Sequence, residues 1–339
     1  MQRTARRLGW LSLAVILLFW IMIRFLGDDV WWTLPVLYGP RWLYTLVMLG
    51  VIPWLVTAPR RAALPVLVGA VLAVFGVLDW RIGLGGLTAG DGPALRVLEL
   101  NAGAGSGGLP NLNDIINELK ARDPDIIVIA ECGLGVSDSL PARFPGYTIR
   151  VAAPELCLAV RGEIQEFSQR DQLDLWKKGG AGEIVRAILV TRAGPVRLGM
   201  VHLATPRNAL DNYLDLSTIP SLGPVTRANI DERDEESRDA RDWIMTGPAM
   251  PTIITGDFNI PVESAIYRRY WASFRNAFSA SGRGTGYTKH TRLWGVRIDH
   301  VLMTKDIHAV RSFTGKDVGS DHLPVIADLR LPQRTSTAR

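Results

Sequence analysis

The sequence Gly-Asp-Phe-Asn at 256–259 comes directly after a short apolar run, and two comparable strings follow it along the chain. They are Arg-Ile-Asp-His at 297–300 and Gly-Ser-Asp-His-Leu-Pro at 319–324. Each string places carboxylate, amide or imidazole groups inside an apolar run or at its end. Because a β-sheet protein brings acid–base and metal-binding groups to one rim in this way, the strings predict an active site.

Three upstream runs end in the same manner. Asn101 closes Leu-Glu-Leu-Asn, Glu131 follows Ile-Ala, and His202 follows Met-Val. A single string of this kind would carry no information, but six in order along one chain favour a common site at the ends of neighbouring strands.

From residue 95 onward, short apolar runs typical of strands alternate with loops and a few helical patterns. Strands are predicted at 96–101, 125–130, 147–152, 155–161, 183–191, 196–203, 251–255, 297–303, 308–313 and 324–331. Helices are predicted at 111–121, 230–245 and 262–277. About ten strands with few helices indicate an α+β domain in which two sheets pack together and helices lie outside.

The N-terminal part of the chain is far more apolar than the rest. Residues 8–23, 42–58 and 62–78 carry no charge, and each run approaches the ~20 residues needed to cross a bilayer. Tryptophans border these runs, as is typical at membrane interfaces. We therefore expect three transmembrane helices. The alternatives are a cleaved signal peptide in the first run and buried helices of a soluble domain.

The arginines predict how these helices are oriented. Five lie at the ends assigned to the cytoplasm and three, offset by aspartates, at the opposite ends: Arg3, Arg6, Arg7, Arg60 and Arg61 against Arg24, Arg41 and Arg81. The positive-inside rule then places everything after residue 81 outside the cytoplasm, in a multi-pass protein of the cell (inner) membrane. A second run that fails to span, with Pro53 inside it, would reverse the side.

Composition divides the chain into four parts. Residues 1–81 are expected to be a membrane anchor, 82–94 a Gly-rich linker, 95–331 a catalytic domain and 332–339 a disordered tail. The first part accounts for the whole net charge of +5, so the basic balance reflects membrane topology and gives no evidence for a nucleic-acid-binding domain. Cys132 and Cys157 lie in apolar runs and are interpreted first as buried thiols, with an extracytoplasmic disulfide as the alternative.

In this order, the motifs resemble the endonuclease/exonuclease/phosphatase superfamily, which has the fold of pancreatic deoxyribonuclease. The resemblance covers residues 96–331, and the strings at 256–259 and 319–324 are its most specific marks. It implies a four-layer αββα sandwich of mostly antiparallel sheets and an enzyme that cleaves phosphate esters with Mg²⁺ or Mn²⁺. Such chemistry needs a cation on the phosphoryl oxygens, an activated water in line and neutralisation of the leaving oxygen.

The resemblance also implies a metal site in which Glu131 is the primary ligand, completed or neighboured by Asn101 and Asp321. A hard cation prefers such oxygen donors. Asp257 would orient or deprotonate the water, and Asn259 would hydrogen-bond the phosphate. These two residues are expected to alternate on one strand extension and so to share a face, with an Asx-type turn as the structural alternative.

His322 is expected to stabilise the transition state while Asp299 holds it in one tautomer, since a carboxylate favours the cationic imidazole. His202 resembles the histidine that protonates the leaving group, although a lone histidine at a strand end is more often structural. Arg186 matches a phosphate-contacting arginine only loosely, and a surface salt bridge is the alternative.

The loop at 281–297 is basic, contains no acidic residue and includes two aromatic residues. Its candidate substrate-binding groups are Arg283, Lys289 and Arg292. They suit a single strand or a flexible polyanion, and equally a lipid head group at a membrane surface; a solvated loop is the structural alternative. Abasic-site repair enzymes carry an acid and a tryptophan where this chain has Gly103 and Val296, which argues against DNA base repair.

These observations predict a membrane-anchored, divalent-metal-dependent phosphodiester hydrolase, in the first place an endonuclease acting outside the cytoplasm on nucleic acid. One alternative is a phosphodiesterase or phosphatase for phospholipids or envelope phosphate esters. Another is an inactive binding domain, against which the intact catalytic set argues. The expected partners are the phosphodiester substrate and the lipid bilayer, and the sequence indicates no protein partner.

Overall fold

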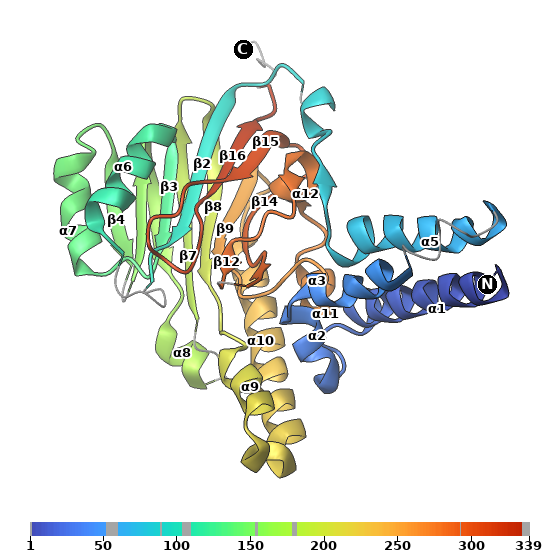
Figure 1. Cartoon of the computed structure of the whole chain (residues 1–339). Helices are drawn as coiled ribbons and strands as arrows, with labels where there is room; N and C mark the ends of the chain where they lie inside the picture. Colours follow the sequence, from blue (N-terminus) through green and yellow to red (C-terminus); the bar gives the residue numbers. More distant parts are fainter. Residues whose placement is uncertain are drawn as a thin grey trace.

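Two six-stranded sheets form the centre of the protein, whose computed structural model describes residues 2–51, 60–88, 90–103, 110–152, 155–177, 182–291 and 293–333 (Figure 1). The first sheet has the order β10-β14-β9-β8-β7-β6, from Arg275–Asn276, Asp299–Met303, Thr252–Asp257, Gly194–His202, Glu183–Thr191 and Gly162–Gln169. The second has the order β15-β16-β2-β3-β5-β4, from His308–Thr314, Val325–Arg330, Ala94–Asn101, Ile126–Ala130, Leu156–Val160 and Thr148–Ala152.

Helices cover the outer faces of both sheets. The second sheet carries α6 (Leu112–Arg122) and α7 (Leu134–Arg143), and the first carries α10 (Leu222–Ile244) and α11 (Ala265–Tyr270). Shorter elements are α8 (Gln172–Lys177), α9 (Arg207–Asp211), η6 (Asn212–Leu214), η7 (Leu216–Ser221), α12 (Ala277–Ser281), β11 (Arg283–Gly284), β12 (Lys289–His290) and β13 (Gly295–Val296). The prediction of two packed sheets flanked by helices is confirmed.

Each sheet is mixed, because it contains one parallel pair among antiparallel neighbours. The parallel pairs are β2 with β3 and β8 with β9. The carboxyl ends of parallel neighbours meet at the same edge, and β14 runs antiparallel to β9 so that its first residue, Asp299, lies opposite the last, Asp257. This topology brings the strand ends that carry the polar motifs to one rim.

The core explains why the strands are so apolar. Successive side chains of β2 enter different hydrophobic clusters. Val97 belongs to the cluster between the two sheets, and Leu98 belongs to the cluster under α6 and α7. A third cluster joins the first sheet to α10 and α11. Strands buried on both faces bury nearly every side chain, as β3 does along its whole length.

The predicted strands are present, with ends shifted by a few residues, but several other elements differ. Helix α7 was not predicted, and α10 begins at Leu222 rather than at residue 230. Strand β6 was missed because its side chains are mostly polar and none is fully buried, so it has no apolar run. The helix predicted at 262–277 is instead two short helices, α11 and α12, separated by β10. Asn276 accepts a hydrogen bond from the Ser279 backbone and starts α12 anew, which a helical pattern of apolar residues cannot reveal.

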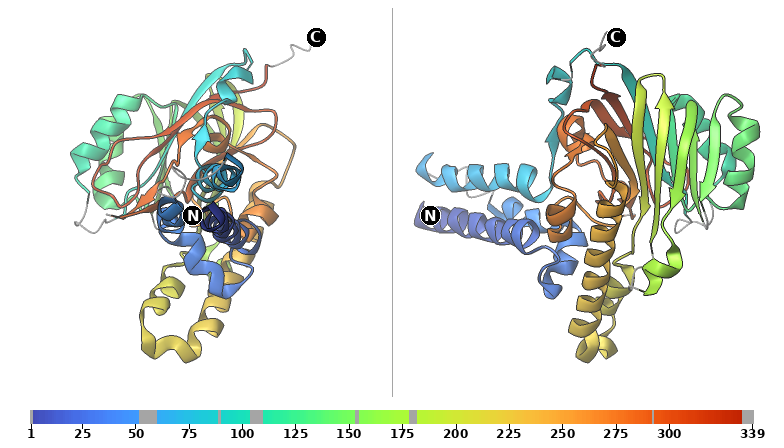
Figure 2. Two further views of the ribbon diagram at one scale, coloured as in Figure 1. Left: turned by 45° about the vertical axis from the view of Figure 1, so that its right-hand side comes forward. Right: turned by 180° about the vertical axis from the view of Figure 1, so that it is seen from behind.

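The N-terminal segment projects from the sheets as a bundle in which α1 (Gln2–Ile21) and α5 (Arg60–Leu72) lie side by side (Figures 1 and 2). Between and after them lie η1 (Met22–Leu26), η2 (Trp31–Thr33), α2 (Leu34–Tyr38), α3 (Arg41–Thr45), η3 (Leu46–Val51) and η4 (Ala73–Val77). Large apolar side chains are exposed along α1 and α5.

One helix of the described chain, at Arg3–Leu26, is long and apolar enough to cross a membrane. The prediction of three such helices is therefore wrong for the described residues. The apolar helices at Arg41–Val51 and Ala63–Val77 are shorter, and residues 52–59 of the second predicted span lie outside the described part.

The Gly-rich segment expected to be a linker packs against the domain formed by the two sheets. The first residue of this segment, Ile82, ends strand β1 (Arg81–Ile82), which pairs with β11. Further along, η5 (Gly85–Thr88) lies against β15. A Cβ at Gly85 would come within 2.9 Å of the Ala309 carbonyl oxygen. Here glycine permits close contact between backbones rather than providing flexibility. Residues 334–339 of the expected tail lie outside the described part.

Cys132 and Cys157 form a disulfide that joins the end of β3 to β5. Both residues are buried in the cluster beneath α6 and α7. The first interpretation, two buried thiols, is therefore wrong, and the disulfide named as the alternative is present. Burial was predicted correctly, but the pairing depends on β5 returning beside β3, which spacing alone does not show.

Candidate active site

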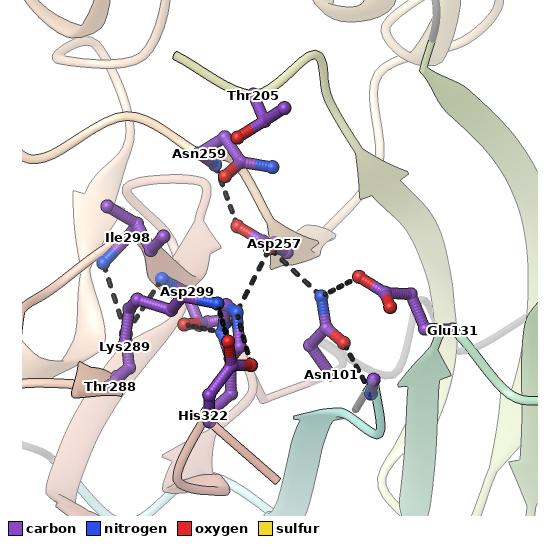
Figure 3. Close-up of polar contacts among 12 residues, drawn as sticks. Asn101, Glu131, Thr205, Asp257, Asn259, Thr288, Lys289, Ile298, Asp299 and His322 are labelled. Atoms are coloured by element: carbon purple, nitrogen blue, oxygen red, sulfur yellow. Dashed lines mark hydrogen bonds and ion pairs between the residues drawn. The ribbon is translucent and has the colours of Figure 1, made fainter. Parts of the chain in front are cut away.

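The predicted polar residues meet at one edge of the two sheets (Figure 3). In the second sheet, β2 ends in Asn101 and Glu131 directly follows β3. In the first, β8 ends in His202, β9 ends in Asp257 and β14 begins with Asp299. His322 precedes β16 and reaches the same place, so side chains from both sheets form a single cluster.

At the centre of this cluster, His322 lies between the buried carboxylates of Asp299 and Asp257, and its Nε2 is also 3.7 Å from Asp321 Oδ1. Its Nδ1 is 3.0 and 2.9 Å from the two oxygens of Asp299, and its Nε2 is 3.7 Å from Asp257 Oδ2. The side chains of His322, Asp299 and Asp257 are all buried. Because the buried carboxylate of Asp299 accepts from Nδ1, it fixes the imidazole with Nε2 facing Asp257.

The buried charges of this centre shift one another's pKa. Burial disfavours the cationic imidazole, but the Asp299 and Asp257 carboxylates outweigh it and raise the pKa of His322. Burial, followed by the charge of Asp299, raises the pKa of Asp257. Burial also opposes ionisation of Asp299, yet contact with His322 lowers its pKa below the ordinary value. The centre therefore favours an ionised Asp299 beside a cationic His322, with Asp257 the more basic carboxylate.

A second group, Asn101 and Glu131, borders this centre. The Asn101 amide donates to Glu131 Oε1 at 2.9 Å and to Asp257 Oδ2 at 3.0 Å, and thereby links the two groups. His202 Nε2 lies 3.6 Å from the same Glu131 oxygen. The Glu131 side chain is 39% exposed, so its carboxylate can be reached from solvent.

The donor set around Glu131 fits a hard divalent cation. A carboxylate and an amide oxygen are the ligands that Mg²⁺ prefers, and the ion usually keeps several waters. Gly103 is buried against these groups: its N–H donates to Asn101 Oδ1 at 2.9 Å, and a Cβ there would collide with the Glu131 carboxylate. Asp257, Asp299 and His322 also bring ligand atoms within 4.8 Å of one another, but His322 and Asp299 are already bonded together.

Glu131 and Asn259 both adopt left-handed backbone conformations, with φ of 49° and 51°. Asp79 and Asp123 are the other non-glycine residues of the described chain with positive φ. Such conformations are costly, persist only where surrounding contacts hold them, and cluster at functional sites.

The expectation that Asp257 and Asn259 alternate on one strand is wrong. Strand β9 ends at Asp257, and the positive φ of Asn259 turns the chain away. Asp257 Oδ1 accepts from the Asn259 backbone at 2.8 Å, which is the Asx-type contact that the sequence also allowed. The Asn259 amide donates to the Leu203 carbonyl at 2.8 Å and so ties β9 to the end of β8.

The remaining predicted residues divide between the rim and other places. Asp321 is ion-paired with Lys289 and lies 3.8 Å from Arg207, a cation that the sequence analysis overlooked. Arg186 lies elsewhere: it donates to Thr246 at 2.8 Å, beside the end of α10. Arg283 is exposed on β11, and Arg292 lies outside the described residues.

Glu99 is a buried acid that sequence reasoning missed. It lies two residues before Asn101 on β2, so both side chains point between the sheets. Neither of its carboxylate oxygens has a hydrogen-bond partner. Burial, followed by the charges of Asp299 and Asp257, raises its pKa well above the ordinary value. An acidic residue alternating with Asn101 was the available signal.

Comparison with known proteins agrees with this geometry. The sequence profile of the Endonuclease/Exonuclease/phosphatase family matches residues 98–322, which include every polar group of the cluster. The chain belongs to this family. Its members hydrolyse phosphate esters, nucleases and phosphatases among them, and typically use a divalent metal. No curated protein sequence matches the chain significantly.

Solved structures share the fold of the family domain. The endonuclease/exonuclease/phosphatase from Beutenbergia cavernae DSM 12333 is 18% identical, with a TM-score of 0.52 over 73% of this chain and 74% of that one. A humanized D. rerio TDP2 is 15% identical, with a TM-score of 0.54 over 70% and 99% of the two chains. A family protein from Bacteroides thetaiotaomicron is 14% identical, with a TM-score of 0.51 over 74% and 99%. At these identities the likeness establishes the fold alone.

We expect Glu99→Gln to stabilise the protein more at pH 8 than at pH 4. The raised pKa keeps Glu99 protonated when folded, whereas the unfolded chain ionises above about pH 4.3. The free energy of unfolding therefore falls as the pH rises above about 4.3, and Glu99→Gln removes this fall because glutamine does not ionise. Thermal unfolding in EDTA at both pH values measures it, with exposed Glu166→Gln on β6 as the control. An equal change in Tm at both pH values would contradict the assignment.

Proposed function

We propose that this protein is a metal-dependent phosphodiester hydrolase anchored in a membrane, with its active site outside the cytoplasm. The observation that supports it most is the convergence of two groups at one rim. One is the buried Asp257–His322–Asp299 centre, and the other is the Asn101–Glu131 pair, which packs against Gly103.

Each residue has a role in this proposal. Asp257 orients the attacking water and accepts its proton, for which a raised pKa is suitable. His322, cationic beside Asp299, offers Nε2–H to the charge that develops on the phosphoryl oxygens. His202 gives a proton to the leaving oxygen. Glu131 and Asn101 would hold a Mg²⁺ or Mn²⁺ ion, which supplies positive charge to the phosphate.

The roles assigned to Asp321 and Asn259 from the sequence each require the side chain to leave a contact that it makes in this structure. Asp321 is a metal ligand only if it leaves its ion pair with Lys289. Asn259 reaches the phosphate only if its amide leaves the Leu203 carbonyl. In the present geometry, Lys289 and Arg207 are cations at the rim that suit an anionic substrate.

Membrane anchoring is supported by the apolar helix at Arg3–Leu26 and by exposed apolar side chains on α1 and α5. Arg3, Arg6 and Arg7 lie in the first turns of this helix, which favours a cytoplasmic N-terminus. Helix α5 begins with Arg60 and Arg61 at the end of the bundle that is farthest from the sheets, beside the N-terminus (Figure 1). The disulfide between Cys132 and Cys157 suits an oxidising compartment.

Nucleic acid outside the cytoplasm is the first candidate substrate, because a polyanion fits Lys289 and Arg207 at the rim. One contact favours a second candidate, a phospholipid head group. The Trp42 indole in the N-terminal segment donates to the Leu293 carbonyl at 3.0 Å, and Leu293 is 67% exposed. This contact joins the loop beside Lys289 to the segment that would enter the membrane.

The full-length protein in nanodiscs decides between these substrates. It is incubated with plasmid DNA, with RNA and with mixed phospholipids, each with Mg²⁺ and with EDTA. Metal-dependent cleavage of nucleic acid supports the first candidate, and metal-dependent release of a head group supports the second. If no substrate, including bis-p-nitrophenyl phosphate, is hydrolysed in Mg²⁺ or Mn²⁺, the proposed function is wrong.

A phosphatase reporter that is active only outside the cytoplasm should work when fused after Arg339. A single crossing by the helix at Arg3–Leu26, with its arginines inside, is sufficient to carry the domain out. A fluorescent protein that folds only in the cytoplasm should stay dark at the same position and shine when placed before Met1. Bright fluorescence at the C-terminus would contradict the proposed side.

A further inference from the structure

The N-terminal segment lies directly behind the loop that leaves the active site. We call residues 28–41 the junction segment and residues 257–265 the catalytic loop. In Figure 1, α2 of the junction segment and α3, which begins at the segment's last residue, lie beside α11, which begins where the catalytic loop ends. Hydrogen bonds join the junction segment to three places along the loop.

The first contact is at Asn259. Its carbonyl oxygen accepts from the Tyr38 hydroxyl at 2.9 Å and from Arg233 of α10 at 3.1 Å. Arg233 also donates to the Tyr38 hydroxyl, and its guanidinium lies 5.5 Å from the centre of the tyrosine ring. Both side chains are buried, so solvent does not compete for these bonds.

The other two contacts follow at the end of the loop. Arg41 forms a bidentate pair with Glu263, at 2.6 and 2.9 Å, and both side chains are buried. Asp28 accepts from the Ser264 hydroxyl and from the Ala265 backbone, each at 2.7 Å. Ser264 is the N-cap of α11, so the junction segment also fixes where that helix starts.

These contacts reach the chemistry through Asn259. The same residue donates its backbone N–H to Asp257 Oδ1 at 2.8 Å, in a left-handed conformation that neighbouring contacts must hold. A shift of Asn259 would therefore move the carboxylate that faces His322. The N-terminal bundle also contacts the Arg-Ile-Asp-His motif at 297–300. Asp79, at the end of the bundle, accepts a hydrogen bond from Arg297, which lies two residues before Asp299.

We infer that the junction segment is a positioning element of the active site, in which Tyr38 and Arg41 hold the catalytic loop so that Asp257 keeps its orientation. This inference rests on the proposed function, because it concerns the same site. It implies that the membrane segment and the catalytic domain form one functional unit. A chain beginning at residue 95 would lack all of these contacts.

The first test is Tyr38→Phe in the full-length protein, with bis-p-nitrophenyl phosphate as substrate. The expected result is a kcat about 10-fold lower with KM within about twofold, because misplacement of a reacting group lowers the rate more than binding. Tyr44→Phe is the matched control. The Tyr44 hydroxyl lies 3.4 Å from the Pro35 carbonyl, so this variant loses a tyrosine hydroxyl that bonds within the N-terminal segment and not to the catalytic loop.

The second test is a cycle on the buried ion pair, with Arg41→Gln, Glu263→Gln and both together. Each single change leaves one buried charge unpaired and should lower kcat by about 10-fold or more. The double variant leaves no unpaired charge, and its kcat should return to within about threefold of the unchanged enzyme. A purely local effect of each residue would instead make the losses add.

Hydrogen–deuterium exchange across residues 256–265 gives a readout that does not need activity. We expect faster exchange there in Tyr38→Phe and in both single glutamine variants, and near-normal exchange in Tyr44→Phe and in the double variant. An inactive unchanged protein with this exchange pattern would contradict the proposed function but not the positioning role. Folded variants with unchanged kcat and unchanged exchange would overturn the positioning role.

Discussion

His322→Ala is expected to lower kcat for bis-p-nitrophenyl phosphate by roughly 10²–10⁴-fold, the range for a lost acid–base group. The imidazole is the group that the geometry prepares most completely. Asp299 holds its Nδ1 at 3.0 and 2.9 Å, and Nε2 lies 3.7 Å from Asp257. Asp257→Ala should cause a loss in the same range. Steady-state kinetics, with a thermal unfolding scan to confirm folding, measures both.

The matched control is His308→Ala, since His308 begins β15 and contacts Arg275 on the domain surface. It should leave kcat within about twofold. Asp299→Asn should act through His322, so Asp299→Asn combined with His322→Ala should be hardly slower than His322→Ala alone. A folded His322→Ala enzyme with near-normal turnover, or fully additive losses, would refute the assigned roles.

The site could be predicted from sequence largely because strand ends carry a local signal. Asn101, Glu131, His202 and Asp257 each follow an apolar run, and parallel neighbours deliver such ends to one edge. The sequence therefore identifies both the residues and their approximate place. It does not show the turn at Asn259, because a left-handed residue after a strand breaks the alternation on which the prediction depended.

Contacts between distant segments carry no comparable signal. Tyr38 and Asn259 are 221 residues apart, and nothing near either residue indicates the other. The same holds for the disulfide between Cys132 and Cys157, which depends on how β5 returns beside β3. Arg186 shows the opposite error: its place in a strand resembled a phosphate contact, but its guanidinium donates to Thr246 instead.

The glycines illustrate the same limit. A Gly-rich run looked like a linker, yet Gly85 is a place where two backbones approach closely. Gly103 was noticed only as the loss of an acid found in repair enzymes. In the structure its missing Cβ lets the Glu131 carboxylate pack against it, a positive role that appears only once the facing side chain is known.

Removal of divalent metal is the second change from which we expect a very large effect. Excess EDTA should reduce turnover of bis-p-nitrophenyl phosphate to background, and Mg²⁺ or Mn²⁺ should restore it. The reason is the partly exposed Glu131 carboxylate, an oxygen donor of the kind that hard cations prefer, with the Asn101 amide hydrogen-bonded to it. The disulfide leaves no free cysteine for a thiolate site. Undiminished turnover in EDTA would refute the metal assignment.

Glu131→Gln localises this requirement to one side chain. Replacing the carboxylate by an amide keeps its size but removes the negative charge, so the metal concentration for half-maximal activity should rise by about 10-fold or more. Manganese binding, followed by electron paramagnetic resonance, should weaken in parallel and does not depend on turnover. Exposed Glu166→Gln on β6 is the control and should change neither quantity. If both variants bind and respond to metal alike, the ion is held elsewhere, and the Asp257–Asp299–His322 group becomes the site to test.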